Sequence, residues 1–342
     1  MKRFVFASLV WLATALAATA QTKRVPGPLG HGQEFGGIRT FLHAPYVDDI
    51  EKVNADIVVM GVPFDEGTTA RSGARYGPRD IREGSLIYAG TNGFFYIDGE
   101  QWVLRGTKWV DVGDVDVEPM EPGITFGRVT EAVRAIRRRN ALPVTLGGDH
   151  SITFPVIRAY GLPSLTVVHF DAHLDSYGDP PSRDAIPTFV TDHGSWVSAV
   201  AQLPGVKIIQ IGMRGIANDE QGLKLSRKYG AIVITSEQIH RNGIQSALSA
   251  IPKSENIYVT IDIDVLDPAL APGTGTVEIG GLTFQQLSDM LRAIPSKGRL
   301  VGMDVVEVNP YYDPTGVTAQ TAARLIIDLL GAVFPSKGPA SP

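Results

Sequence analysis

Short apolar runs of strand length recur along the chain and alternate with stretches of helical periodicity. Several of these runs are apolar at every position, which is typical of strands covered on both faces. Eight runs predict strands: 57–60, 108–112, 144–146, 165–168, 207–211, 232–234, 257–261 and 300–303. Their alternation with helices predicts a parallel sheet that carries helices on both faces.

Two stretches carry clear amphipathic helix patterns. The first ends in the basic run 137–139, which is predicted to be a solvated helix C-terminus favoured by the helix dipole. Its apolar stripe consists of Phe126, Val129, Val133 and Ile136. The second, 318–334, carries Leu325, Ile326, Leu329 and Leu330. No repeat or linker divides the globular part, so 54–336 is predicted to be one domain, preceded by a Gly- and Pro-rich arm, 21–53.

The first twenty residues differ in kind from the rest of the chain. Lys2 and Arg3 form a short positive segment, 4–20 carries no charge, and Ala18-Thr19-Ala20 offers a small-x-small cleavage site. This is the pattern of a secretory signal peptide, whereas a membrane anchor would need about 20 strongly apolar residues. We expect cleavage after residue 20, export to the periplasm or the exterior, and no stable membrane insertion afterwards.

Composition excludes some partners and narrows the choice of metal ligands. With 342 residues, 44% of them hydrophobic and 20% charged, the chain has the make-up of a soluble globular enzyme. Its net charge of −5 becomes −7 once Lys2 and Arg3 are removed, and no basic patch predicts nucleic-acid binding. Because the chain has no cysteine, a metal ion would be held by histidine and carboxylate groups.

Metal-ligand side chains cluster where three of the predicted strands end. They are His150, Asp171, His173, Asp175, Asp262 and Asp264. Alternate side chains of an extended backbone point the same way, so Asp171, His173 and Asp175 share one face. Open parallel sheets bind ligands outside the carboxyl ends of their strands, where all six side chains would converge. Each segment alone also fits an ordinary turn, but their coincidence at three strand ends favours a metal centre.

Four carboxylates and two imidazoles can supply four ligands to each of two metal ions if two carboxylates bridge. Oxygen and nitrogen ligands of this hardness favour manganese, with zinc, nickel, iron and cobalt as weaker candidates. Two metals about 3.5–4 Å apart lower the pKa of a bridging water and generate a nucleophile at neutral pH. Four other histidines are predicted to be structural: His31, His43, His169 and His240.

Three segments resemble, in the same order, the signatures of the ureohydrolase (arginase/agmatinase) family. They are Gly147-Gly148-Asp149-His150-Ser151, Asp171-Ala172-His173-Leu174-Asp175 and Asp262-Ile263-Asp264-Val265-Leu266-Asp267-Pro268. Further segments are closer to the agmatinase branch: 61–65, 73–79, 271–276 and 302–308. The resemblance covers about 56–334. It implies an arginase-like three-layer αβα fold with a central parallel sheet, expected to have eight strands.

The resemblance also implies a hydrolase of C–N bonds in linear amidines with two manganese ions per subunit. One ion would be held by His150, Asp171, Asp175 and Asp262. The other would be held by Asp171, His173, Asp262 and Asp264, so that Asp171 and Asp262 bridge. Because the family commonly forms trimers or hexamers, a homo-oligomer is expected.

The default reaction implied by the resemblance converts agmatine to putrescine and urea. A hydroxide bridging the metals would attack the guanidinium carbon. Glu307 would receive the guanidinium, a planar cation best held by a bidentate acceptor. His193 would pass a proton to the departing amine, which an imidazole can do near neutral pH.

Departures from the family pattern fall where the distal end of the substrate pocket is expected. Stretch 176–192 is longer than in a typical agmatinase, and Ser195-Trp196 replaces the more usual Thr followed by a small or apolar residue. Agmatine's ammonium needs carboxylate or carbonyl acceptors, whereas 4-guanidinobutyrate or 3-guanidinopropionate needs Arg, Lys or backbone N–H donors. Arg71 and Arg183 could reach that region or be surface charges, and Arg75 is predicted to be structural.

Three alternatives therefore stand beside agmatine hydrolysis. The first is hydrolysis of a guanidino acid or of a smaller guanidine compound. The second is a non-catalytic secreted protein that binds a ligand, and the third is amide deacetylation on a related metal fold. The paired ligand set and Glu307 favour hydrolysis of a guanidinium over the last two.

Overall fold

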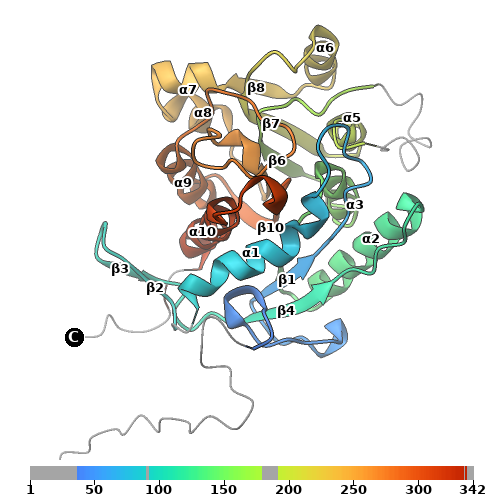
Figure 1. Cartoon of the computed structure of the whole chain (residues 1–342). Helices are drawn as coiled ribbons and strands as arrows, with labels where there is room; N and C mark the ends of the chain where they lie inside the picture. Colours follow the sequence, from blue (N-terminus) through green and yellow to red (C-terminus); the bar gives the residue numbers. More distant parts are fainter. Residues whose placement is uncertain (1–36, 90–91, 179–191, 335, 337–342) are drawn as a thin grey trace, which may run out of the picture. The chain divides into compact units, whose positions relative to one another are not determined.

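The computed structural model describes residues 37–89, 92–178, 192–334 and 336. An eight-stranded parallel sheet forms the centre, with strand order β4-β1-β5-β10-β9-β6-β7-β8 (Figure 1). Its strands are β1 Ile57–Gly61, β4 Trp109–Asp114, β5 Leu142–Leu146, β6 Leu165–Phe170, β7 Val206–Met213, β8 Ile232–Thr235, β9 Asn256–Asp262 and β10 Arg299–Val306. Each contains or overlaps one of the eight apolar runs, so the predicted arginase-like αβα fold is confirmed.

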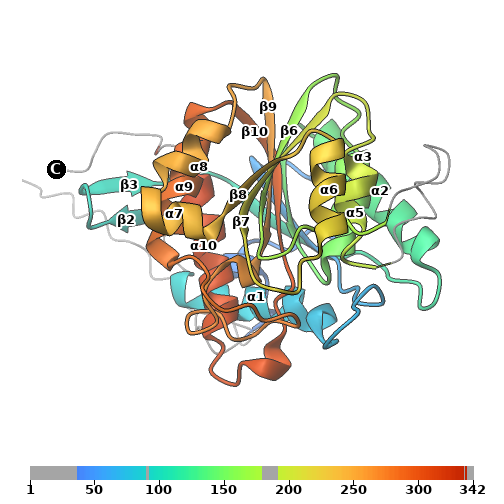
Figure 2. The same ribbon diagram turned by 90° about the horizontal axis from the view of Figure 1, so that it is seen from above.

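Helices cover both faces of the sheet, as Figure 2 shows in the view from above. One face carries α2 Pro122–Arg138, α3 Thr153–Arg158, α5 Trp196–Val200 and α6 Glu220–Lys228. The other carries α1 Gly77–Ser85, α7 Ser236–Asn242, α8 Gln245–Ala250, α9 Phe284–Ala293 and α10 Val317–Val333. Both predicted helices are present, as α2 and α10.

The apolar core is divided by the sheet into two clusters. In β1 the side chains of Ile57 and Val59 join one cluster, and those of Val58 and Met60 join the other. This is the alternation expected of a strand buried on both faces. The predicted stripe of α2 is buried against the second cluster: Phe126, Val129, Val133 and Ile136.

Some structure outside the sheet was not expected from the pattern. Residues ahead of β1 pack onto the sheet at β4, where Phe41 is fully buried and its ring stacks on Trp109, with the ring centroids 5.7 Å apart. An antiparallel hairpin, β2 Phe94–Tyr96 and β3 Gln101–Val103, was also missed. Its Asp98-Gly99 pair is a standard hairpin signal that would have found it.

Several predictions concern residues outside the described ranges. The signal peptide 1–20, residues 21–36 of the arm 21–53, His31 and Arg183 lie there, so these predictions and the domain limits 54–336 stay predictions. Within the described ranges, no helix has the length and apolar character needed to cross a membrane.

Candidate metal centre and active site

Four neighbouring strands deliver the predicted site residues to one edge of the sheet. They are β5, β10, β9 and β6, which are consecutive in the strand order. Immediately at or after their carboxyl ends lie Gly147, Glu307, Asp262 and Asp171. The convergence follows from the parallel topology, because all carboxyl ends of parallel strands meet at the same edge.

The turn after β5 fixes where His150 points. A Cβ on Gly148 would lie 1.7 Å from the carbonyl oxygen of Phe64, so only glycine allows this close approach. Asp149 then accepts hydrogen bonds from the backbone N–H groups of Gly67 and Ser151, at 2.8 and 2.9 Å. His150 is held fully inside the protein as the first residue of a short 3₁₀ helix, His150–Ile152.

A first group of ligand atoms surrounds His150. Its Nδ1 lies 3.0 Å from Oδ2 of Asp171, 3.1 Å from Oδ2 of Asp175 and 3.4 Å from Oδ2 of Asp262. This Nδ1 atom is buried and makes no hydrogen bond, although three carboxylate oxygens are within reach. Lone pairs that converge without hydrogen-bonding one another are typical of ligands that share a cation.

A second group lies beside the first. Nδ1 of His173 is 3.1 Å from Oδ2 of Asp264 and 3.5 Å from Oδ1 of Asp171. Asp171 therefore directs one oxygen to each group, and Asp262 accepts a hydrogen bond from the backbone N–H of Asp264 at 2.9 Å. The structure thus brings all six predicted ligands together, with Asp171 between the two groups.

The electrostatics of these carboxylates match a site that binds cations. Burial and the charges of Asp264 and Asp171 raise the pKa of Asp262 well above its ordinary value. Burial also raises the pKa of Asp264, although His173 opposes this. Burial has the same tendency at Asp171, but the charge of His169 and three imidazole contacts hold its pKa well below the usual range. Burial lowers the pKa of His150 and of His173, but the neighbouring aspartates raise both pKa values well above 6.5, so protonated imidazoles balance the carboxylates when no metal is bound. Two divalent ions would take over this role.

Two contacts around the ligands were missed by the sequence analysis. Nε2 of His150 lies 2.9 Å from the hydroxyl of Thr260, which directs the opposite ring nitrogen toward the carboxylates. Nε2 of His169 lies 2.7 Å from Oδ2 of Asp171. His169 thus supports a ligand from within β6, which agrees with the structural role predicted for it. The contact of His150 with Thr260 depends on how the strands pair, whereas His169 and Asp171 lie two positions apart, so alternation along one strand could have indicated their contact.

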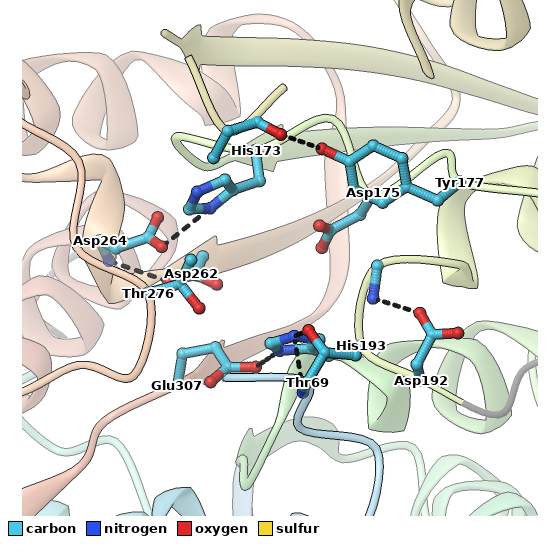
Figure 3. A pocket seen from close by; sticks show the side chains of 12 residues that line it. Thr69, His173, Asp175, Tyr177, Asp192, His193, Asp262, Asp264, Thr276 and Glu307 are labelled. Atoms are coloured by element: carbon cyan, nitrogen blue, oxygen red, sulfur yellow. Dashed lines mark hydrogen bonds and ion pairs between the residues drawn. The ribbon is translucent and has the colours of Figure 1, made fainter. Parts of the chain in front are cut away.

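Glu307 and His193 form a pair across the cavity from the second ligand group, as Figure 3 shows. Nδ1 of His193 lies 2.9 Å from Oε1 of Glu307, and its Nε2 lies 2.9 Å from the Thr69 hydroxyl. Burial lowers the pKa of His193, but the charge and hydrogen bond of Glu307, together with the charges of Asp175 and Asp149, raise it to about 10. Glu307 has a φ of +62°, in the left-handed region that is sterically unfavourable for residues other than glycine, so its surroundings must hold it there.

These residues line a cavity of about 330 Å³. Its described lining consists of Thr69, His173, Asp175, Tyr177, Asp192, His193, Gly194, Ala217, Asp262, Asp264, Thr276 and Glu307. Five of these are carboxylates, and none of the described lining residues is Arg or Lys. The arrangement is suited to a small cationic ligand beside a metal pair.

Comparison with known proteins identifies the family. A model described as the arginase family matches residues 55–331. The chain belongs to the arginase family. Guanidinopropionase from Pseudomonas aeruginosa is 35% identical, over 89% of this chain and 95% of that protein. Agmatinase from Chromobacterium violaceum is 35% identical, over 86% of this chain and 88% of that protein. The crystal structure of a hypothetical agmatinase from Burkholderia thailandensis aligns with a TM-score of 0.75 at 33% identity, over 90% and 95% of the two chains.

Membership of the arginase family confirms the predicted family and enzyme class. Arginase-family proteins are binuclear-metal hydrolases of amidine C–N bonds, and this chain carries the buried histidine and aspartate groups that such a centre requires. The chain is therefore an amidinohydrolase acting on guanidino compounds.

Proposed function

We propose that this chain hydrolyses agmatine to putrescine and urea at a pair of manganese ions. One observation carries the proposal: two ligand groups share Asp171 at the base of a cavity that also contains the Glu307–His193 pair. A protein that only bound a ligand would not need a charge-balanced centre for two metals. Manganese is favoured by the set of oxygen and nitrogen ligands.

The ligand sets follow the two groups of atoms. The first ion would be held by His150, Asp171, Asp175 and Asp262. The second would be held by Asp171, His173 and Asp264, which lie together, and by Asp262, which the family resemblance adds. When bound, such a metal pair lowers the pKa of water enough to supply a nucleophile at neutral pH. The four aspartates carry −4, which two divalent ions neutralise.

Glu307 is suited to receive the guanidinium. Its Oε1 already accepts hydrogen bonds from the backbone N–H of His150, at 2.8 Å, and from His193. Its Oε2 is buried without a hydrogen-bond partner, as is the hydroxyl of Thr276 in the same lining. A guanidinium that donates N–H groups to Oε2 would satisfy this atom and orient its carbon toward the metal ligands.

His193 is suited to protonate the departing amine. Its Nε2 accepts from the backbone N–H of Thr69 at 3.3 Å and lies 2.9 Å from the Thr69 hydroxyl, so the ring proton on Nδ1 is directed to Oε1 of Glu307 at 2.9 Å. Burial lowers the pKa of His193, but Glu307 together with the charges of Asp175 and Asp149 raises it to about 10, so in the metal-free protein the ring holds its proton at neutral pH. A guanidinium at Glu307 would weaken that stabilisation and make the proton easier to give up.

The charge of the cavity supports agmatine over a guanidino acid. Beyond the metal ligands, Asp192 and the phenol of Tyr177 line the cavity, and Asp192 can accept from an ammonium group. The rival reading depends on Arg183, which lies outside the described residues, and on Arg71. Arg71 donates from Nε to the carbonyl of Gly275, next to Thr276. Its side chain is exposed, and its guanidinium already stacks on Tyr312 at 4.7 Å. Arg71 is not among the described residues that line the cavity.

A substrate panel tests this proposal. Urea release would be measured from the chain lacking residues 1–20 with agmatine, 4-guanidinobutyrate, 3-guanidinopropionate, arginine and guanidine. We expect the highest kcat/KM for agmatine, and we expect Asp192→Asn to lower it for agmatine more than for the guanidino acids. A preference for a guanidino acid that Arg71→Ala abolishes would replace agmatine with that acid.

Export and assembly complete the proposal. The charge pattern and cleavage site within residues 1–20 support export to the periplasm or the exterior. Assembly into a homo-oligomer is proposed from family membership. Mass spectrometry of the N-terminus and light scattering of the exported protein test these two points separately.

A further inference from the structure

Asp175 is held in a conformation that its own backbone does not favour. Its φ is +47°, in the left-handed region where a side chain crowds the following carbonyl. The residue nevertheless directs Oδ2 to within 3.1 Å of Nδ1 of His150. Contacts from elsewhere in the chain must therefore fix it in this position.

The first turn of α5 supplies those contacts. The indole Nε1–H of Trp196 donates to Oδ2 of Asp175 at 2.8 Å. The backbone N–H of Val197 donates to the carbonyl oxygen of Asp175 at 3.0 Å. Trp196 is fully buried, so this is a hydrogen bond without competition from water. Neighbouring residues of α5 thus hold both the side chain and the backbone of Asp175.

The indole ring also packs on the histidines of the first ligand group. Its centroid lies 4.8 Å from that of His150, with the planes at 30°, and 4.9 Å from that of His169, at 72°. His169 in turn contacts Asp171. One side chain therefore touches two predicted ligands, Asp175 and His150, and a residue that supports a third.

We propose that Trp196 is a positioning residue that sets the affinity of the first metal ion by orienting Asp175. The inference rests on the proposed function, because it assumes that Asp175 is a ligand. The second ion is held by other carboxylates and by His173, none of which Trp196 is observed to hydrogen-bond within the described ranges. Loss of the indole N–H should therefore affect the two ions unequally.

Manganese titration of the metal-depleted chain by calorimetry tests this inference. In Trp196→Phe, which removes the N–H and keeps an aromatic ring, we expect one of the two affinities to fall about 10- to 100-fold, as typical when a partner of a metal ligand is lost. The other affinity should stay within about twofold of the parent value. Trp109→Phe is the matched control, because Trp109 stacks on Phe41 away from the metal ligands and should change neither affinity.

Two outcomes would overturn the inference: both affinities unchanged in Trp196→Phe, or both reduced equally in a variant whose folding is intact. If Trp196→Phe does not fold, 3-benzothienylalanine at position 196 keeps the ring shape and removes only the N–H. Failure of the proposed function looks different, because the parent chain itself would then bind no manganese or release no urea. A parent chain that binds two ions but hydrolyses none of the tested substrates still allows the affinity test.

Discussion

Two clusters of buried charge in this molecule differ in what neutralises them. In the first, Arg82 donates from Nε and Nη2 to the two oxygens of Asp111, at 2.8 and 3.0 Å, and from Nη1 to Asp114 at 2.6 Å. The second is the candidate metal centre, whose described lining contains carboxylates and histidines but no Arg or Lys. The first cluster contains a permanent counter-charge, whereas the second has only titratable histidines, whose place as counter-charge two bound cations would take.

This difference separates structural from functional burial of charge. Both carboxylate oxygens of Asp111 have donors: Arg82 donates to each, and the backbone N–H of Phe41 also donates to Oδ2 at 2.8 Å. In the metal centre, Nδ1 of His150 and Oδ2 of Asp264 lack hydrogen bonds, as does Oε2 of Glu307 nearby. Polar atoms left without partners inside a protein are costly, so their concentration in one place indicates a ligand.

The largest effect on turnover is expected from Asp171→Asn, which removes the carboxylate shared by both ligand groups. We expect turnover to fall more than about 100-fold, since even the loss of an outer partner of a metal ligand typically costs about 10- to 100-fold. Urea release and metal content per chain measure the effect. Asp328→Asn is the control, because Asp328 is a buried carboxylate that pairs with Arg324 and Ser288 and contacts no predicted metal ligand within the described residues. This variant should keep full metal content.

A smaller loss is expected from Glu307→Gln, which removes charge from the proposed guanidinium acceptor. A hydrogen bond to a charged group is worth about 1.5–3 kcal/mol, so kcat/KM should fall roughly 10- to 100-fold. Metal content should stay unchanged, and its loss would assign Glu307 to the metal centre instead. Steady-state kinetics and metal analysis of the same sample distinguish the two results.

Glu307→Gln should also change the pKa of His193 and the pH dependence of stability. Burial lowers the pKa of His193, but Glu307 raises it to about 10, so Glu307→Gln should return it toward or below the ordinary 6.5. Because the folded-state pKa is raised, the pair stabilises the protein fully below about pH 6.5, and this stabilisation is lost as the pH rises to about 10. NMR titration and unfolding of metal-depleted protein test both statements. A stability difference between parent and variant that grows with pH would contradict them.

No effect on turnover per folded molecule is expected from Arg82→Ala. This change leaves Asp111 buried without its counter-charge, and such losses typically cost about 3–5 kcal/mol of unfolding free energy. Arg79→Ala, on the same helix, breaks an exposed pair with Asp80 and should cost less than about 1 kcal/mol. Urea denaturation followed by circular dichroism measures both. A loss of metal in Arg82→Ala would remove the distinction between the two clusters.

Much of the fold could be predicted because its central strands are nearly continuous apolar runs. The strands β9 and β6 are buried at every position, so their pattern is visible without knowledge of their neighbours. The hairpin of β2 and β3 was missed because its strands are short and partly exposed. Its burial depends on α10, where Asp328 accepts a hydrogen bond from Tyr96.

The candidate site also contains features that the sequence could predict and features that it could not. The side chains of Asp171, His173 and Asp175 could be grouped because they follow one strand, but the extended backbone assumed for them was wrong. The strand β6 ends at Phe170, and residues 172 and 173 form a bend. The contact of Trp196 with Asp175 could not be predicted, since it joins residues 21 positions apart through the placement of α5. The left-handed φ of Asp175 is likewise imposed by packing and has no local sequence signal.

The most direct test of the binuclear amidinohydrolase is metal content measured together with urea release on one preparation. We predict two metal ions per chain after loading with manganese, urea release from agmatine, and parallel loss of both on chelation with recovery on adding manganese back. A chain that releases urea at full rate after chelation, with no metal detected by mass spectrometry, would contradict the account. So would a folded chain that binds no metal at all.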